Sequence, residues 1–494
     1  MAVKTGSFDF NAISIYTASH QDVTTLLLFM FFFIAFAVKA GFVPFHTWLP
    51  YAHPAAPAHI SGIMSGVLIK IGIFGILRMI LLIKTDYTTI GYIILTLSVV
   101  SGLYGVMLAI MQHNLKKLLA YHSIENIGII GIGIGIGCIG LGANNPIVAS
   151  LGFAGALLHT LNHALFKSLL FYTAGNVYQA THTLDIEKLG GLVKKMPQTA
   201  ILFLIAAIAI CGIPPFNGFI SEFIIYNALY YWTQDAMMLS LLACIFSVLG
   251  LVLIGGLAML CFTKAFGVVF LGNARHEFSH PIKEVSVFQL LPLYLIAFFI
   301  VFIGLMPQLF LNLLIQPVSL FTNISQVNFM PFQGKELEAL QPISWAAWGL
   351  IAFIVLVLLL KKVLAKKRTL ASDLTWGCAY TAPTAKMQYT ASSFVRSYSK
   401  LFKFFLLLPK KEKEVQGIFP INANYESHPY DKIEKWLIDK PLHAFKSFLG
   451  RFLFFQNGKL QFYILYGILF ILLIIYIPLI YQNIIAFIEL LKQL

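Results

Sequence analysis

Long apolar stretches separated by short polar ones make up most of this 494-residue chain. About 20 apolar residues in a helix cross the roughly 30 Å hydrocarbon core of a bilayer. The ten-residue alternation typical of outer-membrane barrels is absent. The pattern therefore predicts an all-α, polytopic membrane bundle of about eleven spans. They lie near residues 24–43, 60–82, 88–111, 124–142, 148–178, 198–212, 214–231, 238–270, 287–313, 343–361 and 461–482. The 238–270 run is too long for one straight span and predicts a bend or two helices.

Composition strengthens the membrane prediction. Hydrophobic residues make up 59% of the chain and charged residues 11%, and the mean hydropathy is +0.83. About a quarter of a soluble domain is charged, so a soluble protein is excluded. The five cysteines form no CxxC pair, and most lie in apolar runs. This pattern favours small buried hydrophobes over iron–sulfur, haem or disulfide roles.

The chain divides into five segments by composition. They are a polar N-terminal segment (1–23), a membrane domain (24–313), a loop with an additional helix (314–361), a basic segment (362–460) and a C-terminal transmembrane helix (461–494). The basic segment holds most of the net charge of +14, and the positive-inside rule places it in the cytoplasm. The lysines of the shorter loops give no consistent side, so the orientation stays open.

The basic segment also contains an amphipathic pattern. Basic and bulky apolar residues alternate in PLHAFKSFLGRFLFF (441–455), which predicts a helix lying at the membrane interface. The segment as a whole is interpreted as a solvated, lipid-facing region. The alternative is a docking surface for a soluble partner, and nucleic-acid binding has no support.

Two segments combine a proline break with a charged residue inside an apolar run. Pro54 and Pro57 precede Lys70, and GIPPFNGFISE places two prolines before Glu222. Proline breaks a helix and frees carbonyl groups. Because a charge in mid-bilayer costs about 2.5–3.5 kcal/mol or more, such residues usually line an ion or proton path. The repetition predicts two broken helices with inverted-repeat character. A purely structural kink is the alternative.

His159, His163 and Lys167 are spaced four residues apart. This spacing places them on one helix face. Histidine titrates near neutral pH and a desolvated lysine can be shifted toward it, so the row is suited to proton relay, with Thr160 and Asn162 beside it. Core histidines with satisfied hydrogen bonds are the alternative. A zinc site is disfavoured because HTLNH lacks the glutamate of the zinc motif and a third ligand.

Further charged residues stand between the apolar runs. HNLKKLLAYHSIENIGII supplies Lys116, Lys117, His122 and Glu125, which belong either to the same path or to an ordinary interfacial loop. Lys39 lies within FFFIAFAVKAGFVPFH, where it either joins the path or extends to the headgroups.

Two other patterns have a structural interpretation. His46, His53 and His59 flank prolines and are expected to form local hydrogen bonds in a loop. The glycine row at 128–140 predicts close helix packing, because it lacks the strand and lysine of a phosphate-binding loop.

These motifs together resemble the antiporter-like proton-pumping subunits of respiratory complex I, Mrp-type cation/proton antiporters and membrane-bound hydrogenases. The matching text is FAVKAGFVPFHTWLPYAHPAAPAHISGIMSGVLIKIGIFGILR, LKKLLAYHSIENIG, HTLNHALFKSLLFYTAGNV and GIPPFNGFISEF, within about residues 20–310. The resemblance implies that Lys70 is the lysine of a first half-channel and Glu222 the terminal acid of a second. It also implies a connecting lysine at Lys116 or Lys117, with the histidine–lysine row as the central relay.

Within that family, the tail TWGCAYTAPTAKMQYTASSF (375–394) and AYHSIENIG resemble the large membrane subunits of hydrogenase-4 and formate-hydrogenlyase complexes. The resemblance implies an integral protein of the bacterial inner membrane, other membrane subunits and a soluble redox arm. It implies no cofactor in this chain, with the nickel–iron centre and iron–sulfur clusters on partner subunits. An Mrp-type antiporter subunit and a truncated, non-pumping membrane anchor are the alternatives.

The chain departs from the family in two respects. Family members have about five further helices before the segment matching 24–43, including the glutamate that pairs with the first lysine. A split gene, a misassigned start or a fragment would explain this. Tyr51 stands where aspartate is usual. The transported ion, the electron donor and the pumping direction are not specified by the sequence.

Overall fold

The computed structural model describes most of the chain. The described residues are 5–7, 9–19, 23–234, 237–276, 278, 280–322, 337–365, 384, 387–401, 410–412, 425–427, 430–456 and 458–493. The chain forms two units, residues 1–430 and 431–494. Helices account for nearly all of the described secondary structure, as predicted. The exception is a two-stranded antiparallel ladder of β1 (Lys410–Glu412) and β2 (Tyr425–Ser427), in which Lys411 faces Glu426.

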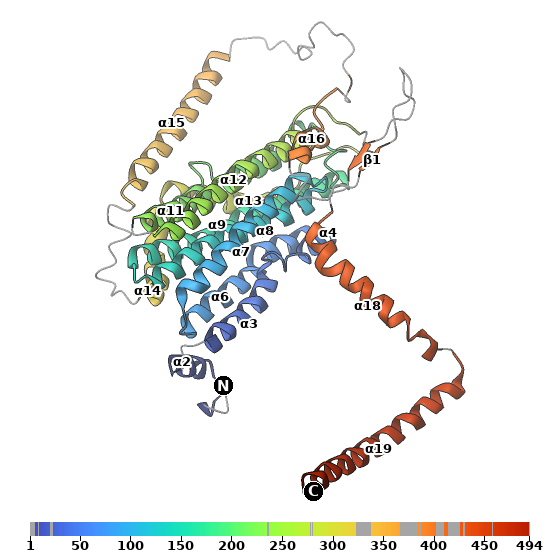
Figure 1. Ribbon diagram of the computed structural model, residues 1–494. Helices are drawn as coiled ribbons and strands as arrows, with labels where there is room; N and C mark the ends of the chain where they lie inside the picture. Colours follow the sequence, from blue (N-terminus) through green and yellow to red (C-terminus); the bar gives the residue numbers. More distant parts are fainter. Residues whose placement is uncertain are drawn as a thin grey trace. The chain divides into compact units, whose positions relative to one another are not determined.

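The first unit is a bundle of helices, most of them long and apolar (Figure 1). They are α2 (Phe10–Ser19), α3 (Val23–Ala40), α4 (Leu49–Ala55), α5 (Ala58–Ile63), α6 (Lys70–Leu82), α7 (Tyr87–Met111), α8 (Leu115–Gly142), α9 (Pro146–Thr181), α10 (Pro197–Ile210), α11 (Asn217–Thr233), α12 (Met238–Phe270), α13 (Val287–Leu305), α14 (Pro307–Thr322), α15 (Leu340–Ala365) and α16 (Ala391–Leu401). A π-helical turn, Met64–Leu68, joins α5 to α6, and a 3-10 turn, Leu192–Lys194, precedes α10.

Helix α8 forms the centre of the bundle, packed between α7 and α9 (Figure 1). Its glycine row allows the backbones to approach closely, as predicted. A Cβ atom at Gly152 of α9 would lie 2.5 Å from the backbone nitrogen of Gly137. A Cβ atom at Gly128 would lie 2.5 Å from the backbone nitrogen of Gly102 on α7. The central position of α8 follows from its small residues, because they let neighbours contact it on both sides.

Nine helices in the described part of the chain are long and apolar enough to cross a membrane. The expected number was about eleven. Part of the difference arises from 198–212 and 214–231, which form α10 and α11, each shorter than a full span. Residues 238–270 form the single helix α12, without a second helix. The expected 287–313 span ends earlier, at Leu305, and α14 begins at Pro307 because proline favours a helix start.

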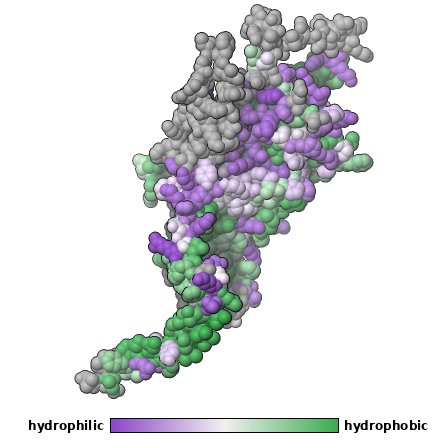
Figure 2. Space-filling model, turned by 90° about the vertical axis from the view of Figure 1, so that its right-hand side faces the viewer, coloured by the Kyte–Doolittle hydropathy of each residue, from purple (hydrophilic) through white to green (hydrophobic). Residues whose placement is uncertain are grey.

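The second unit contains α17 (Lys432–Glu434), a π turn (Lys435–Asp439), α18 (Lys440–Gly450), a 3-10 turn (Leu453–Phe455) and α19 (Leu460–Gln493). The predicted amphipathic helix at 441–455 is present as α18 over most of its length. Hydrophobic side chains cover α19 (Figure 2), which is one of the nine candidate spans. Cys378 and most of the 375–394 tail lie outside the described residues.

Candidate functional site

The first broken helix ends directly before Lys70. Helix α4 ends at Ala55, the chain is extended at Ala56, and α5 passes into the π turn. Lys70 then opens α6 and is buried, and its Nζ atom donates to the backbone oxygen of Ser65 inside the π turn. The break therefore provides a carbonyl acceptor for a buried lysine.

The second break shapes the surroundings of Glu222. Helix α10 ends at Ile210 and α11 begins at Asn217, as the two prolines predict. Gly212 lies between them with a φ of 64°, and a Cβ atom there would lie 2.5 Å from Oε2 of Glu222. Glycine is thus needed both for the left-handed turn and for the space that the buried carboxyl group occupies.

His159, His163 and Lys167 lie on α9 and are fully buried, so the predicted row forms one internal face. Lys167 donates from Nζ to the backbone oxygen of Leu119 on α8. Neither ring nitrogen of His163 has a hydrogen-bond partner among the described residues. Since a buried imidazole without a protein partner normally needs water, this face is suited to a hydrated path.

His159 joins α8 to α11. Its Nε2 atom lies 3.2 Å from Oδ1 of Asn126, and its Nδ1 atom lies 2.9 Å from Oγ of Ser221, the residue before Glu222. Asn126 donates through Nδ2 to the backbone oxygen of His122 at 2.8 Å, which directs its Oδ1 atom toward the histidine. In the neutral ring, Nε2 therefore donates to Asn126. Nδ1 then competes with the carbonyl oxygen of Gly218, 3.0 Å from Oγ, for the hydroxyl proton of Ser221.

An asparagine pair fixes the same α9–α11 contact. Asn162 donates to the backbone oxygen of Asn217 at 2.7 Å and to Oγ of Ser221 at 2.9 Å. Asn217 donates back to Oδ1 of Asn162 at 3.1 Å. Thr160, by contrast, donates to the carbonyl group of Ala156 on its own helix. Asn162 therefore positions Ser221, and Thr160 contributes no bond to the row.

Helix α8 brings a second group of charged residues inside. The interfacial-loop interpretation is wrong, because α8 begins at Leu115. Lys116 is buried and donates to the backbone oxygen of Ala56 at 2.7 Å. His122 and Glu125 are buried and form a hydrogen-bonded pair through Nδ1 and Oε2. Lys117 is half-buried, with Nζ 5.3 Å from the centre of the Tyr51 ring. The structure thus distinguishes Lys116, at the first break, from Lys117.

Two serines that the sequence did not identify connect the first break to α9. The hydroxyl oxygens of Ser65 and Ser123 are 2.8 Å apart, and both residues are buried. Ser123 also donates to the backbone oxygen of Leu119 at 3.2 Å, the atom that accepts from Lys167. A continuous set of contacts therefore runs from Lys70 through Ser65, Ser123 and Leu119 to Lys167.

His53 differs from its predicted role. It lies in helix α4, is fully buried, and neither ring nitrogen has a hydrogen-bond partner among the described residues. Its ring stacks on Phe171 of α9, with the ring centres 4.6 Å apart. Burial, with the charges of Lys167, Lys116 and Lys70, lowers the pKa of His53 to about 3. Tertiary packing thus places this histidine among three lysines of the candidate path, although it lies between two spanning segments of the chain.

Lys39 lies apart from these groups, because its side chain on α3 is exposed. The described residues include no group of three His, Cys, Asp or Glu side chains able to hold a metal ion.

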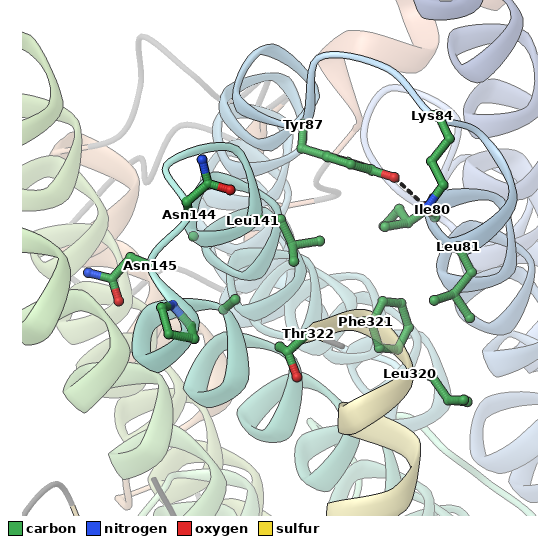
Figure 3. Close-up of a pocket in the computed structure, with 13 residues that line it drawn as sticks. Ile80, Leu81, Lys84, Tyr87, Leu141, Asn144, Asn145, Leu320, Phe321 and Thr322 are labelled. Carbon is green, nitrogen blue, oxygen red and sulfur yellow. Dashed lines mark hydrogen bonds between the residues drawn. The ribbon is translucent and has the colours of Figure 1, made fainter. Parts of the chain in front are cut away.

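A cavity of about 370 Å³ lies at the opposite end of α8 from Lys116. Lys84, Tyr87 and the Asn144–Asn145 turn contribute to its lining (Figure 3), and none of the buried charged residues of the candidate path reaches it.

Comparison with known proteins agrees with these features. The profile of the family described as NADH:quinone oxidoreductase/Mrp antiporter, TM matches residues 1–250. Hydrogenase-4 component B of Escherichia coli (strain K12) is 42% identical over 309 residues, which are 62% of this chain and 46% of that protein. Formate hydrogenlyase subunit 3 of the same strain is 41% identical over 242 residues, which are 49% and 40% of the respective chains. The chain thus spans less than half the length of either relative.

A solved structure gives the fold comparison. A chain of the membrane-bound sulfane sulfur reductase, an archaeal respiratory membrane complex, matches with a TM-score of 0.70 at 23% identity. The match covers 96% of this chain and 72% of that chain. At this identity the likeness shows the fold alone.

Proposed function

The chain belongs to the NADH:quinone oxidoreductase/Mrp antiporter transmembrane family, and from this membership we propose that it is a proton-translocating subunit of a hydrogenase-4-like or formate-hydrogenlyase-like complex. It is an integral membrane protein, and we place it in the bacterial inner membrane. The observation that supports the proposal is a pair of buried polar clusters on α9. One links Lys70 to Lys167 through Ser65, Ser123 and Leu119. The other links His159 to Ser221, the residue before the buried Glu222. Burying these groups is costly, so clusters of this kind imply a function.

The chain's part in this function is to hold and move protons. Electron transfer in a soluble partner arm, which would carry the nickel–iron centre and iron–sulfur clusters, supplies the energy. A nearby opposite charge favours the charged form of a lysine, and its removal releases a proton. Shifts of charge along Glu222, Lys167, Lys116 and Lys70 therefore move protons stepwise. The chain itself needs no cofactor for these steps.

The test uses the whole complex in vesicles from native membranes. Lys167→Ala should leave hydrogen evolution measurable while lowering proton uptake per hydrogen by about 10²-fold, because loss of one acid–base group typically costs that much. Lys188→Ala is the matched control, since its side chain is 60% exposed. Normal proton uptake in Lys167→Ala would contradict the proposal.

Purification through a tag on this chain tests the proposed partners. Recovery of a nickel–iron subunit with iron–sulfur proteins is expected. Recovery of only other antiporter-like chains, with sodium-driven pH changes in vesicles, would instead indicate an Mrp-type cation/proton antiporter. Recovery of the chain alone would indicate a membrane anchor that does not pump.

A further inference from the structure

Lys264 is a fully buried lysine that the path described above does not include. It lies in the apolar helix α12. Its Nζ atom donates to the backbone oxygens of Ile110, at 2.5 Å, and Gln112, at 2.8 Å, where α7 ends. No ion pair joins it to a carboxylate within the described ranges. A cation at the C-terminal end of a helix is favourable, which accounts for a lysine at this position. Burying that lysine without a counter-ion nevertheless costs free energy.

On its inner side, Lys264 is close to the His122–Glu125 pair. Cys261, one turn earlier on α12, and Lys264 itself are both within electrostatic range of the His122 imidazole. The ring of Phe262 lies against His122, with the ring centres 4.5 Å apart. Helix α12 therefore forms one wall around the buried pair and places an ammonium group beside it.

On its outer side, Lys264 is close to a half-exposed acid. Glu187 follows α9 and is within electrostatic range of Lys264. Its Oε1 atom is 3.6 Å from Nδ1 of His113, which directly follows the Gln112 carbonyl that Lys264 contacts. The loops are joined where Ile186 donates to the His113 carbonyl at 2.8 Å. Glu187 is 29% exposed, so it reaches solvent at the end of the bundle.

We propose that Lys264 carries protons between the buried His122–Glu125 pair and Glu187, and so connects the relay to the end of the bundle where α8 begins. The inference rests on the proposed function of the chain. A proton leaves the Lys264 ammonium and reaches the Glu187 carboxylate, directly or through water, which leaves a neutral amine and a carboxylic acid. The His122–Glu125 pair then returns a proton to the amine, and Glu187 releases its proton to solvent. No electron is transferred.

The groups around Lys264 favour this transfer. His122 faces it from α8, Cys261 from its own helix, and Glu187 from the loop after α9. Arg275, in the segment after α12, is within electrostatic range of Glu187 and donates to the carbonyl groups of Leu189 and Val268. The guanidinium group favours the charged carboxylate, so Glu187 returns to its ionised form after each transfer.

Lys264→Arg separates relay from capping. Arginine retains the cation and donors for both carbonyl groups but does not release a proton in proteins. In vesicles containing the complete complex, we expect normal assembly and thermal stability, with proton uptake per hydrogen reduced at least about tenfold. Assembly with normal proton uptake would show that Lys264 is only a cap and would overturn the relay.

Glu187 provides an independent test if the arginine variant does not assemble. Glu187→Gln retains an acceptor for the backbone nitrogen and hydroxyl group of Ser392, which now contact Oε1 at 2.7 and 2.5 Å. It should reduce proton uptake about tenfold. Ser392→Ala is the matched control, because it removes a hydroxyl contact and leaves the acid, and it should pump normally. Equal effects of the two variants, or none, would overturn the proposal. If Lys167→Ala also pumps normally, the proposed function itself fails.

Discussion

The two broken helices hold their charged residues in different ways. At the first break, Lys70 donates to the Ser65 carbonyl inside a π turn, so the site is defined by a hydrogen bond. At the second, the carboxyl group of Glu222 occupies the space left by the missing side chain of Gly212. A cation needs an acceptor, which a disturbed helix supplies, whereas the acid depends on a recess in the backbone turn. The first break should therefore be sensitive to polarity, and the second to volume.

Reversing the polarity of the first break should have the largest effect. Lys70→Glu places a buried carboxylate against the Ser65 carbonyl, and an unpaired buried charge typically costs about 3–5 kcal/mol. We expect little assembled protein and a much lower melting temperature in detergent. Lys70→Met, which is apolar and of similar length, is the control and should be destabilised much less. Equal melting temperatures for the two variants would mean that polarity does not define this site.

Adding one methyl group at the second break should have the next largest effect. Gly212→Ala forces an alanine to a φ of 64° and places its Cβ against Glu222, which should cost about 1–3 kcal/mol. The control is Gly255→Ala in α12, where a Cβ atom meets nothing within 4 Å; it should stabilise by up to about 1 kcal/mol. Thermal unfolding measures both. Glu222→Ala should partly rescue Gly212→Ala, and a lack of rescue would separate the glycine from the acid.

The serine link between the first break and α9 should have a smaller effect. Ser123→Ala removes the 2.8 Å contact to Ser65 and should cost about 1 kcal/mol. Because the two hydroxyl groups are partners, Ser65→Ala and Ser123→Ala together should cost clearly less than the sum of the single changes. A double-mutant cycle of thermal stability measures this coupling, with proton uptake measured in parallel. Strictly additive losses would exclude a functioning link.

The smallest effect is expected at the partly exposed lysine of α8. Lys117→Met should change stability by less than about 0.5 kcal/mol and leave proton uptake unchanged, because this half-buried side chain lies over the face of the Tyr51 ring. Lys116→Met removes the 2.7 Å bond to Ala56 that joins α8 to the first break, and should cost about 1–3 kcal/mol. If Lys117→Met lowers thermal stability and proton uptake more than Lys116→Met does, then Lys117, and not Lys116, is the connecting lysine.

Local features of the sequence predicted the breaks and the face of α9. Proline and glycine at 54–57 and 212–215 restrict the backbone within a few residues, so the helix ends can be placed without tertiary information. The positions of His159, His163 and Lys167 on one face follow from helix geometry alone. The assignment of Lys116, Lys117, His122 and Glu125 was ambiguous, because nothing within a few residues shows whether a polar stretch between two apolar runs continues a helix.

Contacts between distant segments could not be predicted in this way. Ser65 and Ser123 are ordinary serines in apolar runs, and only the packing of the π turn against α8 brings their hydroxyl groups together. The sequence suggested a loop role for His53, but α4 packs its ring against α9. The sequence did not identify Lys264, because a single lysine in an apolar run does not show what it contacts. The two carbonyl groups that accept its hydrogen bonds lie about 150 residues earlier in the chain.

The sequence by itself determined the membrane class, the all-α bundle, the two breaks and which charged residues lie inside apolar runs. Hydropathy, proline and helical spacing act over a few turns, and this range is sufficient for those conclusions. Tertiary structure alone decided which buried groups on distant segments are partners: Lys167 with Leu119, His159 with Ser221, and Lys264 with the end of α7. A hydrogen bond forms only within about 3.5 Å, and only folding brings residues from separate helices to that distance.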